Sequence, residues 1–131
     1  MNQHYELDAS VVHKTWDKEI EPRLTIESGD TVSFDTRDAA DHYYSPNSVS
    51  EDIEKRGPFV GHPLTGPVYI RDAAPGDVLA IEVKAMEFTS NFGWTAVRKG
   101  RGLLPDHDIP GTFLQIWDIT DGSHARMRQR D

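Results

Sequence analysis

A histidine on a stiff loop is the feature of this sequence best suited to chemistry. His62 opens the segment His62-Pro63-Leu64-Thr65-Gly66-Pro67-Val68-Tyr69, in which prolines bracket a loop directly before a predicted strand. A loop of this kind can hold a side chain still over a β framework, and functional residues often lie on such loops. The chain has no cysteine, so a metal site in it would use histidine and carboxylate side chains. The other candidates are Asp35, Asp38, His42 and Asp106.

Composition excludes several classes of function. A chain of 131 residues is long enough for one domain with a hydrophobic core, and its formal net charge of −8 disfavours binding to nucleic acids or anionic membranes. No apolar run reaches the ~18 residues of a membrane-spanning helix, and no secretory signal is expected at the N-terminus. The absence of cysteine fits the reducing cytoplasm. No Gly-x-Ser-x-Gly motif occurs, which disfavours a serine hydrolase.

Short strands separated by turns dominate the first two thirds of the chain. Apolar and β-branched residues favour strands at residues 24–27, 31–36, 67–70 and 78–83. The first two flank Ser28-Gly29-Asp30 and the last two flank Pro75-Gly76-Asp77. Glycine permits a positive φ, and aspartate tends to accept hydrogen bonds from nearby backbone. The sequence therefore predicts two similar hairpins with physically similar turns.

The rest of the chain predicts one further hairpin and one short helix. Residues 112–119 favour a strand, and Asp121-Gly122 then predicts a turn into a last strand at residues 124–127. Residues 48–55 predict a helix, with Ser48 as N-cap and Glu51 completing a capping box. The remainder of 38–66 and the stretch 90–111 are expected to be irregular. We therefore expect one all-β domain over residues 1–131, a sandwich or barrel-like assembly with long loops and at most one short helix.

The order of several segments resembles the N-terminal portion of the acetamidase/formamidase family of amide hydrolases. The resemblance covers most of the chain, and it rests on the ordered set because each segment alone is unspecific. The segments are Val12-His13-Lys14-Thr15-Trp16-Asp17, Leu24-Thr25-Ile26-Glu27-Ser28-Gly29-Asp30-Thr31-Val32, Phe34-Asp35-Thr36-Arg37-Asp38-Ala39, the His62 to Tyr69 segment, Pro75-Gly76-Asp77, Gly93-Trp94-Thr95, Gly102-Leu103-Leu104-Pro105-Asp106 and Phe113-Leu114-Gln115-Ile116-Trp117-Asp118.

The resemblance implies hydrolysis of the C–N bond of small linear amides such as formamide or acetamide. That reaction needs an activated water, a polarised carbonyl and a protonated leaving amine, and a divalent metal can supply the first two. We therefore expect a metal such as zinc or calcium and no organic cofactor. The implied catalytic residues are His62, Asp38 and Asp106, the implied metal ligands are His62, Asp38 and His42, and the implied substrate pocket uses Trp94 and Phe92.

Each of these residues also has a purely structural interpretation that stays open. His62 could tie down its loop through a backbone carbonyl, and Asp38 could start a turn by accepting a bond from backbone two residues on. Asp106 could cap a turn. Trp94 and Phe92 could be core aromatics, because aromatic residues next to glycine often are. Asp35 is expected to be a solvated strand residue.

Two other functions remain open. One is a noncatalytic β-sandwich that binds a partner, although not a blue-copper protein, because that centre needs a thiolate. The other is a subunit or split form, since family members continue with a second β-rich region. An unpaired strand edge near Trp117, with Ile116 and Ile119 exposed, would then promote association. We therefore expect a homo-oligomer or a companion chain that supplies the missing C-terminal region.

Overall fold

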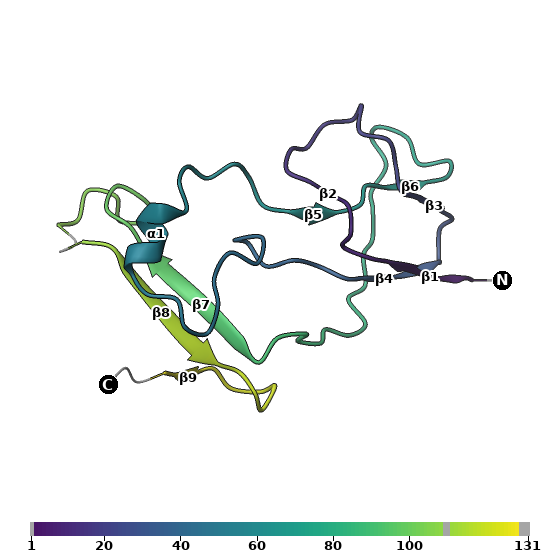
Figure 1. The fold of residues 1–131 in the computed structure, drawn as a ribbon. Coiled ribbons are helices and arrows are strands. Elements are labelled where there is room, and N and C mark those ends of the chain that lie inside the picture. Colours follow the sequence, from purple (N-terminus) through teal and green to yellow (C-terminus); the bar gives the residue numbers. More distant parts are fainter. Residues whose placement is uncertain (1, 109–110, 129–131) are drawn as a thin grey trace. The chain divides into compact units, whose positions relative to one another are not determined.

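The computed structural model describes residues 2–108 and 111–128. Its regular secondary structure consists of strands and one short helix in that part of the chain, so the expected all-β class is confirmed (Figure 1). No helix among these residues is long and apolar enough to cross a membrane. The elements in chain order are β1 His4–Leu7, β2 Val12–His13, β3 Leu24–Ile26, β4 Thr31–Phe34, α1 Glu51–Lys55, β5 Leu64–Thr65, β6 Val68–Ile70, β7 Phe92–Val97, β8 Phe113–Asp118 and β9 Arg126–Met127.

The chain divides into two compact units, each with its own sheets. Unit 1 comprises Met1–His42 and Phe59–Ile81, and it contains β1 to β6. Unit 2 comprises Tyr43–Pro58 and Glu82–Asp131, and it contains α1 and β7 to β9. The expectation of one domain over the whole chain stays a prediction.

Unit 1 is built from two-stranded pairs that join segments far apart in the sequence. β1 pairs with β4 and β3 pairs with β6, both in parallel, while β2 pairs with β5 in antiparallel orientation. The predicted hairpin over 24–36 is therefore wrong. Both of its strands exist, but each finds its backbone partner in another segment, with Leu24 opposite Val68 and Thr31 opposite His4.

The two Gly-Asp turns are alike, as predicted. In each, the aspartate N–H donates to the carbonyl three residues back, from Asp30 to Glu27 at 3.1 Å and from Asp77 to Ala74 at 3.1 Å. In each, the aspartate carboxylate also accepts the N–H of that same residue, at 2.9 and 2.8 Å. The intervening glycine has a positive φ, 93° at Gly29 and 104° at Gly76.

The predicted strand at residues 78–83 is not formed. Val78 is 95% exposed, Leu79 60% and Ile81 77%, and no strand of the described residues pairs with this segment. A strand requires a neighbour for its N–H and C=O groups, so a favourable sequence pattern without a partner does not form a strand.

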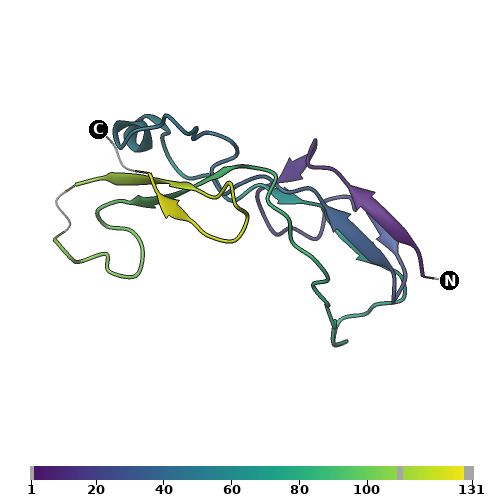
Figure 2. The same ribbon diagram turned by 90° about the horizontal axis from the view of Figure 1, so that it is seen from below.

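Unit 2 is a three-stranded antiparallel sheet in the order β7-β8-β9, with α1 on one side (Figure 2). The predicted strand at 112–119 and the final hairpin are confirmed. β7 corrects the expectation that 90–111 is irregular throughout. It also makes β8 the central strand and not an edge, so Ile116 is buried at 3% exposure, contrary to the expected exposed position.

The helix lies where the sequence predicts it, but its N-cap differs. Ser50 is the N-cap, and its hydroxyl accepts the backbone N–H of Leu114 in β8 at 3.1 Å. The Ser48 hydroxyl instead accepts the backbone N–H of Ser45 at 3.0 Å, so the expected capping box with Glu51 is not formed. The Ser50 hydroxyl thus bonds to β8 and makes no side-chain hydrogen bond to the start of the helix.

The loop between β1 and β2 folds around Arg23. Its Nη1 donates to the carbonyl oxygens of Asp8 at 2.7 Å and Val11 at 2.8 Å, and its Nη2 lies 3.3 Å from Asp8 Oδ1. The Ser10 N–H donates to the same Oδ1 at 2.7 Å. Hydrogen bonds from Ser10, with Arg23 adding a smaller effect, lower the pKa of Asp8 from 3.8 to about 2.

The lowered pKa of Asp8 predicts that the free energy of unfolding decreases in acid. Because the pKa of Asp8 is lower in the folded than in the unfolded chain, its contribution is present above about pH 4 and is lost as the pH falls towards about 2. Asp8→Asn should therefore be less stable than the wild type at pH 7, and the difference should shrink below pH 4. Urea unfolding of both proteins from pH 7 to pH 2 measures this, and parallel profiles would contradict it.

The loop that carries His62 depends on a close backbone approach at Gly61. Gly61 has φ 102°, and a Cβ there would overlap the carbonyl oxygen of Lys14. Gly61→Ala should cost about 2–4 kcal/mol of unfolding free energy, from an unfavourable φ and steric overlap together. Gly76→Ala is the matched control, because Gly76 has φ 104° with no described atom within 4 Å of the added Cβ. It should cost about 1 kcal/mol, and equal losses in the two variants would refute the role of the close approach.

Candidate functional site

A tight turn of unit 1 brings together two of the predicted site residues, Asp38 and His42. Asp38 Oδ1 accepts the N–H of Ala40 at 2.8 Å, and Oδ2 accepts the N–H of His42 at 2.8 Å. The N–H of Asp41 donates to the Asp38 carbonyl at 2.9 Å. Oδ2 also lies 3.2 Å from His42 Nδ1. Asp38 therefore organises the turn, as its structural interpretation expects, and also faces an imidazole.

The turn holds two consecutive residues in the left-handed region. Asp41 has φ 57° and His42 has φ 60°. Non-glycine residues rarely adopt this conformation, and it persists only where the surroundings enforce it. Here the bonds to the Asp38 carboxylate and the anchoring of the Asp41 side chain supply that enforcement.

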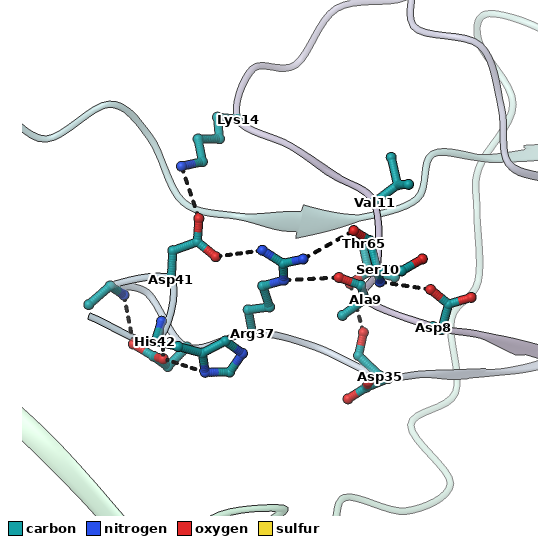
Figure 3. Close-up of polar contacts among 12 residues, drawn as sticks. Asp8, Ala9, Ser10, Val11, Lys14, Asp35, Arg37, Asp41, His42 and Thr65 are labelled. Carbon is teal, nitrogen blue, oxygen red and sulfur yellow. Dashed lines mark hydrogen bonds and ion pairs between the residues drawn. The ribbon is translucent and has the colours of Figure 1, made fainter. Parts of the chain in front are cut away.

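Arg37 anchors the turn to the loop between β1 and β2 (Figure 3). Its Nε donates to the carbonyl of Ala9 at 2.9 Å, its Nη2 to that of Ser10 at 3.1 Å, and its Nη1 to Asp41 Oδ1 at 2.9 Å. Lys14 Nζ approaches Asp41 Oδ2 at 3.1 Å. The hydrogen bond from Arg37, followed by that from Lys14, lowers the pKa of Asp41 below its usual range.

Sequence reasoning missed Arg37 and Asp41 as members of this site. The available signal was an arginine immediately before Asp38, four residues ahead of Asp41, within a segment already matched to the family. The spacing could not be interpreted, because it carries meaning only when the local backbone conformation is known.

His62 is exposed on a well-supported loop of unit 1. The buried Pro63 follows it, and β5 then pairs with β2. The imidazole meets the Phe59 ring edge-on, with centroids 4.9 Å apart. Within the described residues it makes no hydrogen bond to a backbone carbonyl. An exposed imidazole on a supported loop can exchange protons with a ligand.

The remaining predicted site residues belong to unit 2. Trp94 lies on the sheet face covered by α1, with its ring centroid 4.7 Å from that of the buried Tyr44. Phe92 borders a small hollow of about 100 Å³. Asp106 is exposed within a turn closed by the His107 N–H donating to Leu104 at 3.2 Å. The substrate-binding role of the two aromatics and the catalytic role of Asp106 stay predictions.

A metal site without cysteine needs several histidine and carboxylate side chains gathered around one point. Among residues 2–108 and 111–128, no group of three or more histidine and carboxylate side chains is arranged to hold one. Asp38 and His42 are a pair, and the Asp38 oxygens already accept two backbone N–H groups. These residues do not form a full ligand set, and the metal-binding role of His62, Asp38 and His42 stays a prediction.

The sequence is similar to proteins named as formamidases. The chain is 30% identical over 113 residues to a Schizosaccharomyces pombe protein named "Putative formamidase", covering 82% of this chain and 27% of that protein. It is 23% identical over 113 residues to the formamidase of Methylophilus methylotrophus, covering 28% of that protein. The chain thus spans less than a third of the length of these curated relatives.

A solved structure shares the arrangement of the strands. The crystal structure of a protein from Thermoanaerobacter tengcongensis described as a "predicted acetamidase/formamidase" superimposes with a TM-score of 0.78 and 26% identity, covering 97% of this chain and 43% of that one. The sequence model described as "Acetamidase/Formamidase family" matches residues 1–129. This match extends over nearly the whole sequence, and the chain therefore belongs to the acetamidase/formamidase family.

Proposed function

We propose that this chain takes part in the hydrolysis of small linear amides such as formamide or acetamide. The observation that carries the proposal is the family match over residues 1–129, supported by relatives that are named as formamidases. In the reaction a water oxygen bonds to the carbonyl carbon, the C–N bond breaks, and the products are a carboxylate and ammonia. A cytoplasmic location is part of the proposal and is supported by the absence of cysteine.

Two groups of unit 1 have suitable properties for this chemistry. His62 offers an exposed imidazole on a loop supported on both sides. Such a group can take a proton from the attacking water and later give one to the leaving nitrogen. Asp38 orients His42 through the 3.2 Å contact and holds the turn that carries it. In unit 2, Asp106 would act as a proton shuttle or loop anchor, while Trp94 and Phe92 would shape an acyl pocket.

The proposal includes a zinc or calcium ion without assigning its full set of ligands. Such an ion, when bound, would polarise the amide carbonyl and acidify the attacking water. Because the described residues present no complete ligand set, further ligands would have to come from outside these residues.

The alternative is a noncatalytic module or subunit. The specific observation that favours it is the uncovered apolar face of the sheet in unit 2, where Val97 is 40% and Phe113 53% exposed. A subunit of this kind would bind its partner without supplying a reacting group, and variants at His62 distinguish the two functions.

The assay for the proposed function is release of ammonia from formamide and acetamide, with the chain alone and together with the part of the Thermoanaerobacter tengcongensis protein that it does not match. His62→Gln should lower the rate by about 10²-fold or more, the usual contribution of a general acid or base. His124→Gln, which alters another exposed histidine in unit 2, is the control and should retain activity. Release that His62→Gln leaves unchanged would assign the chain to the subunit alternative, and no release under any condition would leave only shared ancestry.

The turn at Asp38 allows its structural and chemical roles to be separated. Asp38→Ala removes the acceptor of two backbone bonds and should cost about 1–3 kcal/mol of unfolding free energy. Asp38→Asn keeps one carbonyl acceptor and should cost less, yet it should lower ammonia release as much as Asp38→Ala if the charge facing His42 matters. Asp35→Ala is the control, because Asp35 is exposed and its hydrogen bonds to other described residues run through its backbone N–H and C=O. Full activity in Asp38→Asn would restrict Asp38 to a structural role.

A further inference from the structure

The sheet of unit 2 has two faces of opposite character. Residues directly opposite each other in the register share a face, so Trp94 and Ile116 lie on the same side. Leu114, two residues from Ile116 along β8, also lies on this side because side chains alternate along a strand. The β8 residues of this side are buried, with Leu114 0% and Ile116 3% exposed, and α1 carries the buried Ile53. Figure 2 shows the helix on one side of the strands of unit 2.

The other side we call the open face. The same register places Val97 opposite Phe113 and Trp117 opposite Met127 on this side. Val97 is 40%, Phe113 53% and Met127 61% exposed, although all three are apolar and lie in regular strands. The open face consists of Thr95, Val97, Phe113, Gln115, Trp117 and Met127.

The open face is ordered in advance of any contact. The Trp117 Nε1 donates to Thr95 Oγ1 at 2.9 Å, which fixes the indole across two strands. An aromatic held in this way loses little conformational freedom when a partner covers it, and a methionine beside it can adapt to irregular surfaces. Val97 with Phe113 and Trp117 with Met127 form two apolar pairs on this face, with Thr95 and Gln115 between them. Exposed apolar groups gathered on a regular sheet are typical of an interaction surface.

We propose that the open face docks the polypeptide that corresponds to the part of the family's chains that this chain does not span, through an apolar β-sheet or loop layer. Two observations show that proteins similar to this chain contain such polypeptide. The Thermoanaerobacter tengcongensis structure contains the same arrangement of strands over 97% of this chain, yet the match covers only 43% of that protein. The match to the Schizosaccharomyces pombe relative covers 27% of that protein.

The size of the open face argues against the same face of a second copy of this chain as the occupant. A strand of six residues is about 20 Å long and its neighbours lie about 4.8 Å away. Three strands therefore offer about 200–300 Å², far below the ~800 Å² per partner of a stable interface. Two copies would also bring together chains that each carry a formal net charge of −8. A larger partner can extend beyond the face and meet the required area.

The proposal rests on family membership and does not require amide hydrolysis, so its test uses binding as the readout. The tagged full chain is co-expressed with the unmatched part of the Thermoanaerobacter tengcongensis protein, and retention of that part on the tag is measured. The wild type should retain it, whereas Phe113→Glu and Val97→Lys should each lower retention about tenfold or more, as expected for the centre of an interface. Ammonia release is not measured, so failure of the proposed function leaves this result intact.

Leu103→Glu is the matched control, because Leu103 is a fully exposed apolar residue of the same unit that lies outside the sheet. It should retain the partner within about twofold of the wild type, as expected for a residue outside the interface. Thermal unfolding of each isolated variant verifies that it folds. No retention by the wild type, or equal losses in all three variants, would overturn the proposal. It would also be overturned by sedimentation showing a dimer of this chain that Phe113→Glu dissociates and Leu103→Glu does not, because the occupant would then be a second copy.

Discussion

The guanidinium of Arg37 links the two loops on which unit 1 of this protein depends. Its three donor groups reach two backbone carbonyls of the loop between β1 and β2 and the Asp41 carboxylate. A planar, permanently charged group suits this task, because it can satisfy several acceptors at fixed angles. Without that link, two consecutive left-handed residues, Asp41 and His42, would have much less to hold them. The turn that faces Asp38 towards His42 thus depends on contacts made outside it as well as on the hydrogen bonds within it.

Apolar burial is sparse among the described residues of this structure, while hydrogen bonds join many of its loops. The sheets of unit 1 are two-stranded pairs, which are marginal by themselves in water. Many large apolar side chains remain in contact with solvent, both in the segment after β6 and on the open face of unit 2. The buried hydrophobic residues among those described are Leu7, Ala9, Ala40, Tyr44, Ile53, Leu114 and Ile116. The chain spans less than a third of the length of these curated relatives. Exposed apolar side chains of this kind are what an interface with further polypeptide would bury.

Family membership and the local geometry are two separate grounds for the proposed function. The family implies amide hydrolysis, while the structure provides a supported imidazole at His62 and an Asp38–His42 pair, both in unit 1. Asp38 fulfils the structural interpretation and still contacts an ionisable partner. A residue that builds a turn can also position a functional group, so the two interpretations of such an aspartate need not compete.

The sequence by itself determined the local features: the all-β class, the two Gly-Asp turns, β8 with its return strand, and the position of the short helix. These depend on glycine at a positive φ, on aspartate side chains near their own backbone, and on short-range patterns. The tertiary structure alone decided which strands pair, so β3 meets β6 and not β4, while residues 78–83 find no partner strand in the described chain. It also decided that Trp94 belongs to a strand and that Arg37 belongs with Asp41. The physical reason is that strand pairing and the closure of distant loops depend on backbone groups far apart in the sequence, which a local pattern does not specify.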